Sequence, residues 1–156
     1  MTGTIKLTRG QLLVDKSLTI QGPGRNQLTI DAAGGDPTPQ TNNGDGIRAL
    51  YVNQLQQRIQ VVIRGIRITG GDVNGTGGGI LTRVETVIDD CEVSDCYASE
   101  DGGGICAQNP KLTISSTAIF NNSSRGAGGI YIGGTGSCLL SDLFVRGNKG
   151  NVGGVA

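Results

Sequence analysis

A glycine motif that returns at a fixed interval constrains this chain more than any other feature of its sequence. Gly-Gly followed by Ile or Val occurs four times, 25 residues apart, at 78–80, 103–105, 128–130 and 153–155. A second pattern of spaced apolar residues keeps step with it at intervals of 25, 26 and 26 residues, beginning at Ile63, Ile88, Ile114 and Leu140. Two independent motifs with one period predict a repeat architecture, in which each unit buries its apolar face against the next.

Each repeat consists of residues typical of short β-strands. Segments 66–68, 91–93 and 143–145 alternate apolar and polar side chains, and no window carries a helical stripe of useful length. The sequence therefore predicts an all-β solenoid of about five to six coils, one per repeat, stacked in parallel about 4.8 Å apart. Two inward-facing files of stacked side chains are expected: Ile80, Ile105, Ile130 and Val155 in one, and Ile68, Val93, Ile119 and Val145 in the other.

The alternation of Gly-Gly-Ile with Leu-Thr-Ile-type strands, and an asparagine at the following corner, resembles the right-handed parallel β-helix repeats of bacterial surface proteins. It is similar to polymorphic outer-membrane protein repeats, whose motifs are Gly-Gly-Ala/Ile and Phe-x-x-Asn. The second motif survives as segments 119–122 and 145–148, with aliphatic residues in the Phe place, and Cys96 stands where Asn122 and Asn148 stand. The resemblance implies a right-handed single-stranded parallel β-helix, the architecture also of pectate-lyase-like proteins. It says little about function, because that fold carries adhesins, polysaccharide lyases and hydrolases alike.

A single domain over residues 1–156 is expected, with irregular first coils over 1–60 and regular coils over 61–156. Strands are predicted in the first part at 4–7, 12–14, 18–20, 28–30, 46–52 and 60–63. Two excursions interrupt them, Ala33 to Asp45 and Asn53 to Arg58. In solenoids such insertions gather on the face that binds, and the alternative is that they cover the end of the stack.

Charge and hydropathy exclude several partners. Thirteen acidic and thirteen basic side chains give no long-range attraction to nucleic acid, and the few aromatic residues form no stacking platform. No apolar run is long enough to cross a membrane. The start of the chain has no signal-peptide pattern, which fits either a cytosolic protein or a segment of a longer exported one. We favour the second, and with it an extracellular or cell-surface location.

The four cysteines are expected to be free thiols. Cys91 falls at an inward position, Cys96 at a corner, and Cys106 should point outward because it follows the inward Ile105. The direction of Cys138 is less certain. No pair has the spacing of a zinc or redox site and the chain has no histidine. A disulfide between Cys96 and Cys106 is the alternative.

Carboxylates are the remaining source of chemistry. Asp90 and Glu92 are two apart and should share a strand face, with Arg67 aligned beside Glu92 in the coil below. One interpretation is a solvated face with an inter-coil ion pair. Another is a calcium site on Asp90, Glu92 and Asp95, because carboxylate oxygens suit that ion.

The resemblance to pectate-lyase-like β-helices implies an enzymatic alternative. It implies carboxylates among Asp89, Asp90, Glu92 and Asp95 with Arg67 or Arg64 as the basic residue, and the catalytic candidates are Asp89, Asp90 and Arg67. Adjacent strand residues point to opposite faces, however, so Asp89 and Asp90 act together only at a bend. The histidine of the β-helical polygalacturonases is missing.

We therefore expect a non-catalytic structural or binding module of a surface repeat protein, with a polysaccharide lyase or glycoside hydrolase as the alternative. The expected partners are a polysaccharide or a cell-surface protein. No cofactor is expected, and calcium is the one candidate ion. No amphipathic helix precedes Ile5, and residues 149–156 either fold over the last coil or leave it open. An open coil has unpaired backbone groups, so the chain is expected to be a piece of a longer β-helix or to associate end to end.

Overall fold

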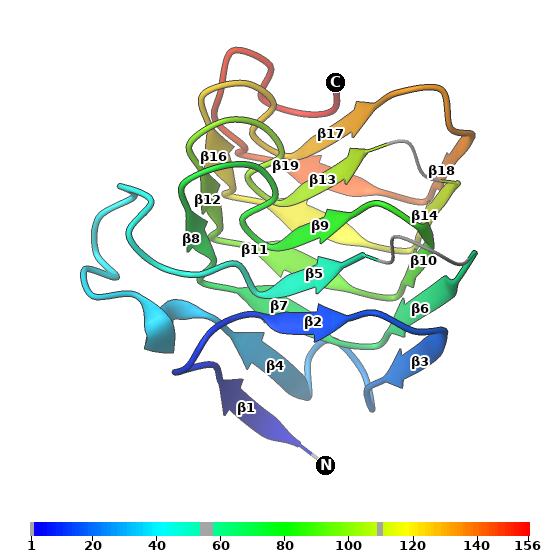
Figure 1. The fold of residues 1–156 in the computed structure, drawn as a ribbon, viewed down its shortest axis with the longest axis horizontal. Helices are drawn as coiled ribbons and strands as arrows, with labels where there is room; N and C mark the ends of the chain where they lie inside the picture. Colours follow the sequence, from blue (N-terminus) through cyan, green and yellow to red (C-terminus); the bar gives the residue numbers. More distant parts are fainter. Residues whose placement is uncertain (1, 54–57, 109–110) are drawn as a thin grey trace.

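The chain winds into a β-solenoid of about five turns, as seen in a computed structural model that describes residues 2–53, 58–108 and 111–156 (Figure 1). Strands of successive turns lie above one another, and every pair of neighbouring strands is parallel. The predicted all-β solenoid is confirmed. The only helical element among the described residues is one 3-10 turn, η1 (Ala33–Gly35). No helix in this part of the chain is long and apolar enough to cross a membrane.

Four parallel sheets form the walls of the solenoid. Sheet A has six strands: β1 (Gly3–Lys6), β4 (Leu28–Asp31), β7 (Arg67–Thr69), β11 (Glu92–Ser94), β15 (Ala118–Phe120) and β19 (Phe144–Arg146). Sheet B has β2 (Leu12–Val14), β5 (Leu50–Val52), β9 (Ile80–Thr82), β13 (Ile105–Gln108) and β17 (Ile130–Gly133). Sheet C has β3 (Leu18–Gln21), β6 (Gln60–Arg64), β10 (Glu85–Asp89), β14 (Leu112–Ser115) and β18 (Cys138–Ser141). Sheet D, which the sequence analysis did not anticipate, has β8 (Asp72–Val73), β12 (Tyr97–Ala98) and β16 (Ser123–Ser124).

The core consists of stacked aliphatic files, as predicted. The glycine motif supplies the sheet B file, in which Ile105 pairs with Ile80 on one side and Ile130 on the other, and Val155 bridges to Ile130. The sheet A file is Ile5, Ile30, Ile68, Val93, Ile119 and Val145. Its internal members are fully buried or nearly so. Each such side chain contributes roughly 1.5 to 3 kcal/mol on burial.

The corner between sheets C and A is built on a backbone conformation that few residues tolerate. Gly65, Asp90, Ser116 and Asp142 occupy equivalent places and have φ of 62°, 47°, 48° and 52°. Short polar side chains and glycine are the residues that adopt this left-handed region at least cost. The strands of sheets C and A are therefore interrupted at this point in every regular coil.

Asparagines brace the next corner, between sheets A and D. The side chain of Asn122 accepts a hydrogen bond from the Cys96 N–H at 3.1 Å and donates one to the Val93 carbonyl at 3.0 Å. Asn148 repeats this one coil further, since its side chain accepts from the Asn122 N–H and donates to the Ile119 carbonyl, each at 3.0 Å. The corner asparagines of the motif therefore form a ladder along the solenoid, in which each side chain satisfies buried backbone groups of the coil below.

Residues 33–45 form the expected excursion, and it lies along sheet D at one side of the solenoid (Figure 1). Asn42 donates a hydrogen bond to the Ser123 hydroxyl in β16, while the Asn43 and Gly44 N–H groups bond to Asp72 in β8. Most of the second excursion, over 54–57, lies outside the described residues. The strand predicted for 46–52 was too long: only Leu50–Val52 is a strand, because Ala49 takes the corner place of the Gly-Gly motif and donates to the Gly78 carbonyl.

Candidate functional site

The acidic residues picked out from the sequence do not converge on one point. Asp89 ends β10, where its Oδ2 lies 3.6 Å from Arg64 Nε and its Oδ1 accepts a 2.7 Å hydrogen bond from the Ser115 hydroxyl. Asp90 is the corner residue with positive φ, and its Oδ1 lies 3.7 Å from Arg25 Nε. Asp90 and Glu92 therefore do not share a strand, since β10 ends before Asp90 and β11 begins at Glu92.

The inter-coil ion pair expected at Glu92 is present. Arg67 Nε lies 2.9 Å from Glu92 Oε1, and Arg67 Nη2 lies 3.2 Å from Asp95 Oδ2. The Nε contact is close enough for an ion pair, although its direction is not that of a hydrogen bond. Arg67 thus holds two of the three carboxylates proposed as calcium ligands, while Asp90 faces Arg25. A calcium site on Asp90, Glu92 and Asp95 stays a prediction.

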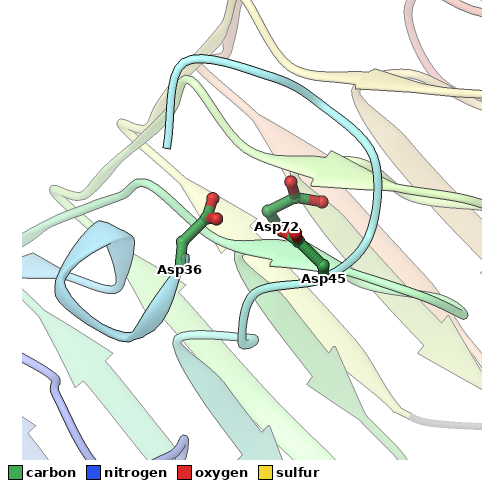
Figure 2. A group of neighbouring side chains, drawn as sticks. All are labelled: Asp36, Asp45 and Asp72. Carbon is green, nitrogen blue, oxygen red and sulfur yellow. The ribbon is translucent and has the colours of Figure 1, made fainter. Parts of the chain in front are cut away.

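A different group of carboxylates does come together (Figure 2). Asp36 and Asp45 in the excursion and Asp72 at the start of β8 each place a carboxylate oxygen within 4.8 Å of the others, the one such group of three or more among the described residues. Asp72 is almost fully buried and accepts hydrogen bonds from the Gly44 and Asn43 N–H groups at 2.7 and 3.2 Å. Oxygen ligands of this kind suit calcium or magnesium.

The surroundings of this acidic group shift the pKa of two of its carboxylates. Burial raises the pKa of Asp72 and of Asp36, and the negative charge of Asp45 raises both further. The N–H donors from Asn43 and Gly44 act in the opposite direction on Asp72. Sequence analysis missed the group because Asp36 and Asp45 lie far from Asp72 in the chain. The only indication in the sequence was that Asp36 and Asp45 lie in an excursion that was expected on the binding face.

A groove runs across the outer face of sheet A. It has a volume of about 590 Å³ and is lined by Arg25, Asn26, Glu92, Ser116, Thr117, Ala118, Phe120, Asp142 and Phe144. Phe120 and Phe144 come from neighbouring strands, β15 and β19, at the positions beside the inward Ile119 and Val145. The Phe144 side chain is 54% exposed, and the Arg146 guanidinium lies 5.6 Å from the centre of its ring.

The wall of this groove is held by one arginine. The turn between β3 and β4 carries Arg25, whose Nη1 donates to the Ser116 carbonyl at 2.7 Å and to the Cys91 carbonyl at 3.4 Å. With the Asp90 contact, these bonds tie the turn to corner residues two and three coils above it. Charge-assisted hydrogen bonds of this type are stronger than neutral ones, so the groove has a fixed rim. Sequence analysis found too few aromatic residues for a stacking platform and did not single out Phe120 and Phe144, although their outward direction follows from the inward Ile119 and Val145.

The cysteines offer no reactive site in the core. All four are free, as expected. Burial raises the pKa of Cys91 to about 11 and that of Cys96 to about 12, so both thiols stay protonated at neutral pH. Cys106 lies outside the core cluster, beside Leu81 and Tyr131 in the outward file, yet it is buried. Cys138 is exposed on the last coil.

No known protein family, curated protein or solved structure matches this chain. The β-solenoid fold and the geometry above are therefore the grounds for its function.

Proposed function

We propose that this chain is a non-catalytic binding module of a surface or extracellular repeat protein, and that the groove on sheet A holds a polysaccharide. The observation that carries the proposal is that two aromatic side chains, Phe120 and Phe144, line an open groove whose other lining residues are mostly polar. Aromatic rings offer an apolar face to the C–H groups of a sugar ring. The surrounding hydroxyl, amide and carboxylate groups can bond to its hydroxyls.

The charges of the groove favour a neutral polysaccharide over an acidic one. Its charged lining residues are Arg25, Glu92 and Asp142. Arg25 is occupied by Asp90 and two carbonyls, and Glu92 by Arg67. The groove lining therefore has no unpaired positive charge that could bind the carboxylate of an acidic sugar.

Titration calorimetry with a panel of neutral and acidic polysaccharides tests the proposal. We expect binding to a neutral member, with Phe144→Ala weakening it at least about tenfold, because covering a Phe side chain contributes roughly 1.5 to 3 kcal/mol. Leu139→Ala is the matched control, because Leu139 is equally exposed but lies on sheet C outside the groove lining. Absence of binding across the panel, or equal loss in both variants, would contradict the assignment.

An enzymatic alternative rests on one observation: Glu92 and Asp142 both line this groove. Two carboxylates flanking a sugar are the requirement of a glycoside hydrolase. Incubation of the protein with each polysaccharide that binds, followed by measurement of new reducing ends and of unsaturated products, separates the two functions. The binding module leaves the polymer intact, whereas products that disappear in Glu92→Gln would establish the enzyme.

A further inference from the structure

The coil at the C-terminal end has an uncovered apolar end face. Among the described residues, no strand pairs with the outer edge of β18 or β19. Leu140, Val145 and Val155, which we call the C-terminal end face, belong to inward files but are half-buried or exposed. Val155 is 40% exposed, whereas Ile130 directly below it is fully buried. The Val155 segment lies above Ile130, whereas no described residue pairs with Val155 from above.

Among residues 2–53, 58–108 and 111–156, none covers the outer side of the first coil, which presents a second face made of the same files. Ile5 (42% exposed) and Leu12 (37% exposed), together with Leu18 and Ile20, form the N-terminal end face. Ile5 begins the sheet A file that Val145 ends, and Leu12 begins the sheet B file that Val155 ends. Each end of the solenoid therefore has the aliphatic side chain that the other end needs above or below it.

Stacking one end on the other repeats the contact already made between coils within the chain. With β1 of a second copy placed in parallel on β19, Ile5 falls on Val145 at the strand spacing of about 4.8 Å. The β2 strand of that copy then reaches the Val155 segment and brings Leu12 onto Val155.

The corner also fits. The Cys96 and Asn122 N–H groups each donate to a side-chain oxygen of the following coil. Thr8 of the second copy, three residues after Ile5 as Asn148 is three after Val145, would take the equivalent corner place beside the Asn148 N–H, and its side chain carries a hydroxyl oxygen.

The numbers of strands in the sheets determine which of them can continue from one copy into the next, at what we call the joint. Sheet A has six strands, and sheet B has five plus the Val155 bridge, but sheet C has five. Continuous pairing in sheets A and B consequently leaves one strand position vacant in sheet C between β18 and the second copy's β3. The joint is carried by sheets A and B.

We propose that a second copy of this chain docks its N-terminal end face on the C-terminal end face, head to tail. Such a contact is heterologous and does not close on itself, so it builds linear chains whose length grows with concentration. Unpaired strand edges and apolar files are the features that drive the contact.

Two end-blocked variants test the proposal. Val155→Asp places a charge on the C-terminal end face and Ile5→Asp places one on the N-terminal end face, both at exposed positions that leave the core intact. Light scattering over a concentration series should give masses beyond a dimer for the wild type and a monomer for each variant alone. An equimolar mixture should give a dimer and nothing larger, because one good pair of faces remains. Leu139→Asp, on the outward face of sheet C, should associate like the wild type.

Three results would overturn the proposal. The wild type could stay monomeric to high micromolar concentration, or the mixture of variants could give no dimer. Dimers of Ile5→Asp alone would show instead that two C-terminal end faces meet. Circular dichroism checks that each variant is folded. If Val155→Asp does not fold, Val145→Asp takes its place on the C-terminal end face, and Leu12→Asp likewise replaces Ile5→Asp on the N-terminal end face.

Discussion

Coils in the middle of the solenoid and the coil at its C-terminal end are built from the same repeat, but they differ in what surrounds them. Ile114 and Ile119 in β14 and β15 are fully buried, whereas their equivalents Leu140 and Val145 one coil later are not. The sequences of the two coils are similar, so the difference lies in the neighbours. In a solenoid the stability of a coil depends on the interfaces with the coils on either side.

The largest test of this comparison places the same charge at two positions of one file. Ile105→Asp puts a carboxylate between two buried isoleucines, where neither water nor a cation compensates it. We expect loss of cooperative folding. Val155→Asp, in the same file on the last coil, should melt within a few degrees of the wild type. Thermal melts followed by circular dichroism measure both, and a folded Ile105→Asp protein would refute the inward assignment.

A smaller effect is expected in the asparagine ladder. Asn122→Ala leaves the buried Cys96 N–H and Val93 carbonyl without partners, which costs on the order of 3 kcal/mol. Asn148→Ala on the half-buried last coil should cost about 1 kcal/mol, since water can replace the side chain. Denaturant unfolding gives both values. Equal losses would mean that the last coil is as well covered as the internal ones.

An ion-pair comparison comes next in size. Arg67→Gln removes the partner of Glu92 and Asp95 on the outer face of an internal coil, with an expected loss of up to about 1 kcal/mol. Arg146, which lies against Phe144 on the last coil, provides the matched Arg146→Gln variant, for which we expect less. The loss of unfolding free energy in Arg67→Gln should become smaller at high salt, because salt screens the ion pairs. A loss that does not depend on salt would instead come from the packing of the aliphatic part of the arginine side chain.

The smallest effect extends the comparison to the excursion over residues 33–45. Because the folded-state pKa of Asp72 and Asp36 is raised, their contribution to stability is complete below the ordinary carboxyl pKa and is lost as pH rises through the folded value. Asp45→Asn removes a charge that raises both pKa values, so its unfolding free energy should fall less between pH 4 and pH 7 than that of the wild type. Asp142→Asn, outside the group, controls for net charge, and parallel pH profiles for all three proteins would contradict the coupling.

The sequence determines the solenoid, its period and its inward files, because Ile105 and its equivalents recur in phase and β-pairing follows from that register. The groove and the acidic group could not be predicted in the same way. Arg25 reaches coils more than 60 residues further along the chain, and Asp36 and Asp45 meet Asp72 only through the path of a loop without period. The left-handed conformation at Asp90 was not predicted either, because the alternation of apolar and polar residues does not show where a strand ends.

Residue-resolved hydrogen exchange tests the central claim most directly, namely that each coil is stabilised by the coils stacked on it. In dilute monomer the amides of β9 to β11 and β13 to β15 should exchange slowest, with those of β18 and β19 at least about tenfold faster because the last coil opens without disturbing the rest. Protection as strong in β19 as in β11 under these conditions would contradict the account.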